Sequence, residues 1–119
     1  MSDITIGYVN VFVSDYERAI TFYRDTLGLE VNTADEDFGY ASFNAGTITL
    51  GIAKANEAAL LGRHTGIGFM VKDIHASYER LKDRGVTFDM PPTEQPWGGI
   101  LALFKDPDGN VFYLDPGHL

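Results

Sequence analysis

Imidazole and thiol groups, which serve as metal ligands and nucleophiles, are scarce in this sequence. The 119 residues include only three histidines, His64, His75 and His118, and no cysteine. Disulfides, thiolate metal sites and a cysteine nucleophile are therefore excluded. The serines show no nucleophile-elbow context. The glycines at 62, 66 and 68 precede or lie within an expected strand, whereas a phosphate loop opens a helix.

The acidic residues are the most numerous titratable groups, and they set limits on the partner. A formal charge of −8 and a pI near 4.6 make nucleic acid an unsuitable partner, because phosphate binding needs a basic face. The run Asp35-Glu36-Asp37 falls in an expected loop and is typical of solvated charge. The alternative interpretation is an acidic rim for a cationic ligand.

One domain is expected to position these groups, because 119 residues with 45% hydrophobic content suffice for one core. The apolar runs are too short for a membrane span, and the first residues lack the pattern of a signal peptide. We therefore expect a cytoplasmic protein that binds neither nucleic acid nor membrane.

An internal repeat organises the chain. Residues 7–31 have a counterpart in residues 65–88, with Asp15 and Asp73 at matching positions 58 residues apart. Each copy consists of an apolar strand, an Asp suited to cap a helix, an amphipathic helix and a Gly suited to end it, Gly28 or Gly85. The strands that follow predict two tandem βαβββ modules and an α+β fold.

The module boundaries follow from the repeat. Module one is expected at about residues 4–53 and module two at about residues 64–117, joined by a polar, Ala-rich linker at about 54–63. In module two, Asp106-Pro107-Asp108-Gly109 predicts a tight hairpin. Residues 90–96, with three prolines, predict a stiff loop that delivers Trp97 to the next strand.

This pattern resembles the vicinal oxygen chelate superfamily, which includes glyoxalase I, bleomycin-resistance proteins, fosfomycin-resistance enzymes and extradiol dioxygenases. The resemblance rests on the VSDYERAITFYRDTLGLEV stretch, the two modules and the DPDGN hairpin, and it extends from about Ile4 to Asp115. It implies U-shaped sheets with the helices outside and a ligand cavity on the concave side. In the family's metal enzymes, histidines of the first strands and glutamates of the last strands hold a divalent ion.

At the four corresponding positions this sequence has no such ligand. They fall on Tyr8, Leu50, Gly66 and Tyr113, with Gly51 in place of Leu50 if the register differs by one residue. We therefore expect no metal and no other cofactor. A displaced metal site at His64 and Asp115 is an alternative, and ordinary surface residues are the other interpretation of this pair.

The resemblance and the strand alternation together predict what lines the concave face. We expect ligand-binding residues at Tyr8, Asn10, Phe12, Phe38, Tyr40, Leu50, Gly66, Gly68, Met70, Trp97 and Tyr113, with Val111 beside them. Aromatic rings beside glycines can leave room for a flat molecule. The opposing interpretation is that the same residues fill the core and leave no cavity.

Three functions are compatible with this sequence. The first is a metal-independent binding protein of the bleomycin-resistance type, an acidic homodimer that holds an aromatic or cationic organic ligand, with antibiotic sequestration as one such use. The second is a divergent lyase, isomerase or dioxygenase using His64 and Asp115, or Tyr8 or Tyr113 as acid or base. A tyrosine acid would need its pKa lowered from about 10. The third is a regulatory or partner-binding module without catalysis.

Overall fold

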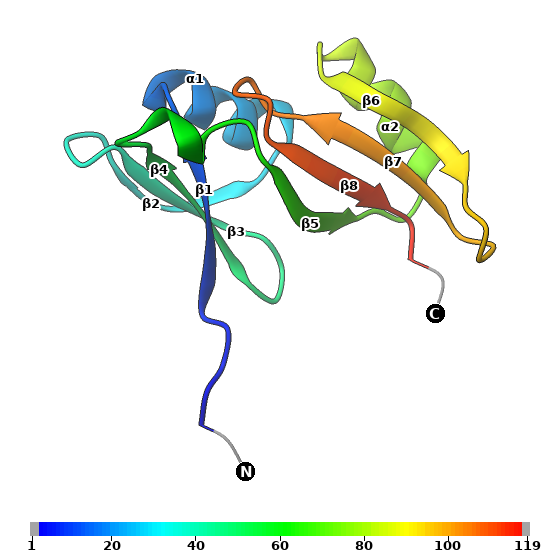
Figure 1. Ribbon diagram of the computed structural model, residues 1–119, viewed down its shortest axis with the longest axis horizontal. Coiled ribbons are helices and arrows are strands. Elements are labelled where there is room, and N and C mark those ends of the chain that lie inside the picture. Colours follow the sequence, from blue (N-terminus) through cyan, green and yellow to red (C-terminus); the bar gives the residue numbers. More distant parts are fainter. Residues whose placement is uncertain (1–2, 118–119) are drawn as a thin grey trace. The chain divides into compact units, whose positions relative to one another are not determined.

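The computed structural model describes residues 3–117; His118 and Ser2 lie outside the described residues. Two compact units make up the chain, one ending at Leu61 and the other beginning at Gly62. Each contains a four-stranded mixed sheet and one long helical segment, which confirms the prediction of two βαβββ modules (Figure 1). Among residues 3–117, no helix is both long and apolar enough to cross a lipid bilayer.

The first sheet has the strand order β1-β4-β3-β2. Its strands are β1 (Tyr8–Val13), β2 (Glu30–Asp35), β3 (Tyr40–Asn44) and β4 (Thr49–Lys54). The first and last strands of the module pair in parallel, and the other pairings are antiparallel. The module's first strand therefore lies directly beside its last strand.

The second sheet repeats this topology with the order β5-β8-β7-β6. It consists of β5 (His64–Met70), β6 (Thr87–Glu94), β7 (Ile100–Lys105) and β8 (Val111–Asp115), and β5 and β8 pair in parallel. A short 3₁₀ helix, Ala58–Leu60, precedes β5. The repeat in the sequence therefore corresponds to a repeat of the complete strand order.

The two aspartates cap the helices as predicted. Asp15 Oδ1 accepts a hydrogen bond of 3.0 Å from the Arg18 amide at the start of α1 (Tyr16–Ile20), and Asp73 Oδ1 accepts one of 3.1 Å from the Ala76 amide at the start of α2 (Ile74–Asp83). In each case a short side-chain acceptor satisfies an amide of the first turn, which has no partner within the helix.

The first helical segment continues as a π-helix, Thr21–Thr26, which the periodicity did not predict. Two successive aromatic residues of this segment are buried in the core, Phe22 and Tyr23, with their rings 5.1 Å apart in an edge-to-face arrangement.

The proline-rich segment is not a loop, contrary to the prediction. Strand β6 extends through Pro91 and Pro92 to Glu94, and its register against β7 shifts on both sides of Met90. This strand is at the edge of its sheet, where a proline leaves no ladder hydrogen bond unmade, and irregular pairing accommodates the rings. The turn that follows is short and carries Trp97.

The DPDGN turn is held by buried polar groups. Asp106 Oδ1 accepts hydrogen bonds from the amides of Asp108 and Asn110, at 2.9 and 2.8 Å, and the Asn110 side-chain amide donates to Asp106 Oδ2 at 2.9 Å. The Asn110 side-chain oxygen also accepts a 3.1 Å hydrogen bond from the Arg63 amide. The turn therefore fixes the start of β5 beside the start of β8.

Candidate functional site

Each sheet has one face covered by its helix and one face that we call the open face. In the first unit the covered face includes Val11, Phe43 and Ile52, and the Tyr23 ring lies 5.9 Å from the Phe43 ring. Successive residues of a strand alternate between the two faces. The open face therefore carries the other parity, which includes Tyr8, Asn10, Phe12, Tyr40 and Gly51.

The strand pairing corrects one predicted site residue. Leu50 is 3% exposed and pairs with Val9 and Phe43 on the covered face, so it belongs to the core. Gly51, its alternative, pairs with Asn10 on the open face. A side chain at residue 51 would collide with the Asn10 carboxamide and would stand 2.8 Å from the Tyr40 hydroxyl.

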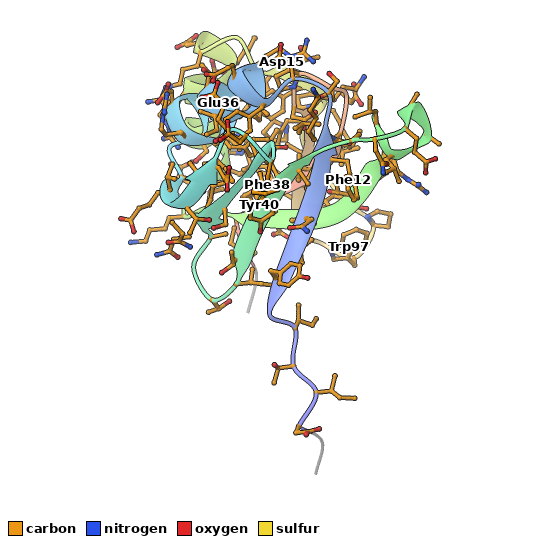
Figure 2. The ribbon with its side chains drawn as sticks, turned by 90° about the vertical axis from the view of Figure 1, so that its left-hand side faces the viewer. Phe12, Asp15, Glu36, Phe38, Tyr40 and Trp97 are labelled. Atoms are coloured by element: carbon orange, nitrogen blue, oxygen red, sulfur yellow. The ribbon has the colours of Figure 1, made fainter. Side chains whose placement is uncertain are left out.

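The open face of the first sheet therefore carries aromatic side chains, and two of them, Tyr8 and Tyr40, end in a hydroxyl group. Tyr8 is 63% exposed, and Phe12 and Tyr40 are half-buried. Figure 2 labels Phe12 on β1 and Tyr40 on β3. In the same sheet, Thr33 of β2 and Ser42 of β3 share a 2.7 Å hydrogen bond between their hydroxyl oxygens. Such a face can stack a ring and can also offer hydrogen bonds.

The open face of the second sheet is more apolar. Tyr113 of β8 pairs with Gly68 of β5 on one side and with Leu103 of β7 on the other, and Leu103 pairs with Met90 of β6. This row of four residues, which we call the central row, crosses the whole sheet and contains no charged side chain. Gly68 is exposed, and the other three residues are half-buried.

The Tyr113 ring is supported at one end of the strand. The His64 imidazole lies with its centroid 5.1 Å from that ring, and its Nδ1 accepts a 3.1 Å hydrogen bond from the Gly66 amide. Gly66 has a φ of +71° and lies where the pairing of β5 with β8 changes register. At the other end of the strand, Met70 pairs with Asp115 and is 66% exposed.

The residues at the family's metal positions do not fit a divalent ion. Tyr8, Gly51, Gly66 and Tyr113 supply neither imidazole nor carboxylate, the ligands that such an ion would take. Within residues 3–117, no group of three or more His, Asp or Glu side chains is placed to hold one. The metal positions are therefore occupied by phenols and bare backbone.

The displaced metal site is not supported either. His64 pairs with Val111 at one end of β8, whereas Asp115 pairs with Met70 at the other end. Four residues of extended strand separate the two levels by about 13 Å, too far for both side chains to bind one ion. Asp115 Oδ1 instead accepts a 2.7 Å hydrogen bond from the Gly117 amide.

Acidic residues of the first unit border a pocket of about 400 Å³ at the start of α1 (Figure 2). Its lining comes from the β1–α1 junction, the β2–β3 turn and the end of β4: Ser14, Asp15, Tyr16, Glu17, Glu36, Asp37, Phe38, Gly39 and Lys54. Phe38 is 84% exposed in this lining, in the turn that leads into Tyr40 of β3. The run Asp35-Glu36-Asp37 is therefore near the helix start and is not spread along a free loop.

Two groups of this pocket titrate unusually. A hydrogen bond with Glu17, together with that residue's charge, raises the pKa of the Glu36 carboxyl above its ordinary value. Burial, followed by the charges of Glu17 and Glu36, raises the pKa of the Tyr16 phenol. Tyr16 therefore remains a neutral phenol at physiological pH.

Some residues of these surfaces escaped the sequence analysis. Met90 was assigned to a loop, although it lies on the open face, and Leu103 was not selected despite its correct parity in β7. Lys105 shares that face, with its Nζ 3.1 Å from Asp89 Oδ1. Trp97, by contrast, lies in the exposed turn between β6 and β7. That the open faces of the two sheets line one cavity stays a prediction.

Comparison with known proteins gives a consistent result. A family model described as "Glyoxalase/Bleomycin resistance protein/Dioxygenase superfamily" matches residues 5–114. A structure of a member of this superfamily from Sphaerobacter thermophilus is 32% identical, covers 94% of this chain and 96% of its own, and has a TM-score of 0.81. TnmS3, an antibiotic binding protein from Streptomyces sp. CB03234, is 29% identical over 97% of both chains, with a TM-score of 0.82. The uncharacterized protein YetH of Bacillus subtilis is 34% identical over 92% of this chain and 95% of its own.

Proposed function

Because the chain belongs to the Glyoxalase/Bleomycin resistance protein/Dioxygenase superfamily, we propose that it is a cytoplasmic binding protein for a small aromatic or cationic organic molecule, which it holds without a metal ion. The observation that carries this proposal is the composition of the open faces. Phenols and glycine backbone stand where the superfamily's metal enzymes have histidine and glutamate, and Tyr8, Gly66 and Gly68 are exposed.

The chemistry of the open faces supports an organic ligand. A half-buried tyrosine beside apolar side chains offers a stacking partner worth about 0.5–1.5 kcal/mol beyond the burial of area. A cationic ligand would gain further from the charge of −8 and from the electron-rich faces of tyrosine rings. The similarity to TnmS3 makes an antibiotic one candidate ligand, and sequestration one candidate use.

We further propose that the protein acts as a homodimer. Ile4 and Ile6, with Tyr8 at the start of β1, are exposed at alternating positions along one stretch of chain, at 85%, 78% and 63%. Exposed apolar side chains that gather in this way mark an association surface. Native mass spectrometry of the untagged protein reports both the subunit count and any ligand that is purified with it.

Isothermal titration calorimetry tests the binding proposal. The panel contains proflavine as a flat aromatic cation, spermidine as a flexible aliphatic cation, and antibiotics of both kinds. We expect at least one aromatic compound to bind, with its affinity unchanged by EDTA, and Tyr113→Ala to weaken binding about tenfold while Tyr113→Phe does not. Silence of the wild-type protein across the panel, or loss of binding with EDTA, would overturn the proposal.

A further inference from the structure

Gly68 occupies the middle of β5, where a glycine is unfavourable. It lies on the open face of the second sheet, directly opposite Tyr113. Glycine weakens a strand, because it loses more backbone freedom on folding than any other residue and offers no side chain to pack. A glycine at such a place needs a reason, and two structural reasons are common: a positive φ, or a neighbour that fills the space of the β-carbon.

Neither reason applies to Gly68. Its φ is not among the positive values of the described glycines. A β-carbon placed on it would meet only the β-carbon of Tyr113, at 3.7 Å, which is an ordinary van der Waals contact. The fold therefore accepts alanine at residue 68, and neither backbone conformation nor packing accounts for the glycine.

Two other glycines in strands, Gly66 and Gly51, illustrate the contrast. Gly66 has a φ of +71°, a conformation that side-chain-bearing residues rarely adopt. Gly51, in the other sheet, lies beneath the Asn10 carboxamide and the Tyr40 hydroxyl. Each of these glycines has a cause in its own unit, so bare backbone at Gly68 is a distinct feature and not a general property of the strands.

We infer that Gly68 is the contact point for a flat aromatic ring, which lies on the bare peptide backbone of β5 with the Tyr113 ring beside it. This inference rests on the proposed function and specifies the part of the ligand that the second sheet recognises. Without a β-carbon, a planar group approaches the peptide planes to van der Waals distance over its whole face.

The rest of the central row fits the same ligand class. Beyond Tyr113 it continues with Leu103 and Met90, and neither carries a charge. Methionine adapts its shape and makes favourable contacts with aromatic rings. The centroid of the His64 ring lies 5.1 Å from that of the Tyr113 ring, so His64 helps to hold the Tyr113 ring in its orientation. The row therefore recognises the uncharged, planar portion of a ligand.

Gly68→Ala tests this inference, with Gly7→Ala as the matched control. Gly7 has an ordinary φ and nothing within 4 Å of a β-carbon, so the control adds the same methyl group outside the second sheet. With proflavine as the probe, we expect Gly68→Ala to lose about tenfold or more in affinity and Gly7→Ala to match the wild type. The melting temperature of Gly68→Ala should equal or exceed that of the wild type, because the added methyl fits.

The outcomes separate this inference from the proposed function. If the wild type binds no compound of the panel, the proposed function fails and the inference with it. If the wild type binds proflavine and Gly68→Ala binds it equally well, only the inference is overturned. Binding of spermidine without proflavine would also overturn it. A marked drop in the melting temperature of Gly68→Ala would show that the glycine serves the fold.

Discussion

Replacing Asn110 by alanine should destabilise the second unit far more than a surface substitution does. The side chain is 1% exposed, donates to Asp106 Oδ2 at 2.9 Å and accepts from the Arg63 amide at 3.1 Å. Asp106 is itself buried, so its oxygen would lose a donor that water cannot easily replace. A buried polar group left without its partner costs about 1–3 kcal/mol. The Arg63 amide would also lose its acceptor, but it is only partly shielded from water and therefore adds less. We expect the free energy of unfolding to fall by about 2–4 kcal/mol in total.

Asn44→Ala is the matched control for this substitution. Asn44 holds the corresponding turn of the first module, with its side-chain oxygen 3.1 Å from the Gly46 amide, but it is exposed. Water can replace that hydrogen bond, so we expect a loss of about 0.5 kcal/mol. Both variants remove a carboxamide from the connection between the last two strands of a module, so the comparison sets a buried, doubly bonded side chain against an exposed, singly bonded one.

Urea unfolding followed by far-UV circular dichroism measures both variants. Trp97, the sole tryptophan, belongs to the second unit, and its fluorescence provides a second probe of unfolding. We expect the midpoint of the Trp97 transition to fall in Asn110→Ala while the slope with denaturant is kept. If Asn110→Ala cost no more than Asn44→Ala, the buried hydrogen bonds would not hold the turn, and the reasoning would be refuted.

Two further predictions concern the first unit. Gly51→Ala should destabilise it by no more than about 1 kcal/mol, because the added carbon meets only the ends of the Asn10 and Tyr40 side chains, which can move aside. A fall in the urea midpoint that corresponds to more than about 2 kcal/mol would contradict this. Glu36→Gln should raise the melting temperature at pH 7 but not at pH 3. The raised pKa of the Glu36 carboxyl means that folding favours its protonated form. The contribution of this carboxyl to stability is therefore present at low pH and is lost as pH rises through the folded pKa. Thermal melts of both proteins across this range, repeated at high salt to screen the Glu17 charge, provide the measurement, and an equal gain at pH 3 would refute the assignment.

Local chemistry made much of the fold predictable. The capping residues Asp15 and Asp73, the terminating Gly28 and Gly85, and the DPDGN turn all act within a few residues of themselves, so the sequence alone reveals them. The proline-rich segment shows the limit. Whether prolines interrupt a strand depends on its place in the sheet, which pairing with distant residues decides.

The candidate site was predictable to the extent that strand parity was known. Tyr113 and Gly68 follow from the alternation within β8 and β5, which both begin at clear signals. Leu50 failed because an error of one residue moves a side chain to the other face, and only the pairing of β4 with β1 fixes that register. Met90 was missed because the second part of β6, from residue 90 onward, was assigned to a loop.

The edge strands of the two sheets differ in how readily a strand of another molecule could pair with them. β6 carries Pro91 and Pro92, and β2 contains a register shift between Val31 and Thr33. Prolines and bulges block edge-to-edge pairing. β1, in contrast, pairs with β4 through six consecutive residues without interruption. Of these three edge strands, β1 is therefore the one along which a strand of another molecule could pair without interruption.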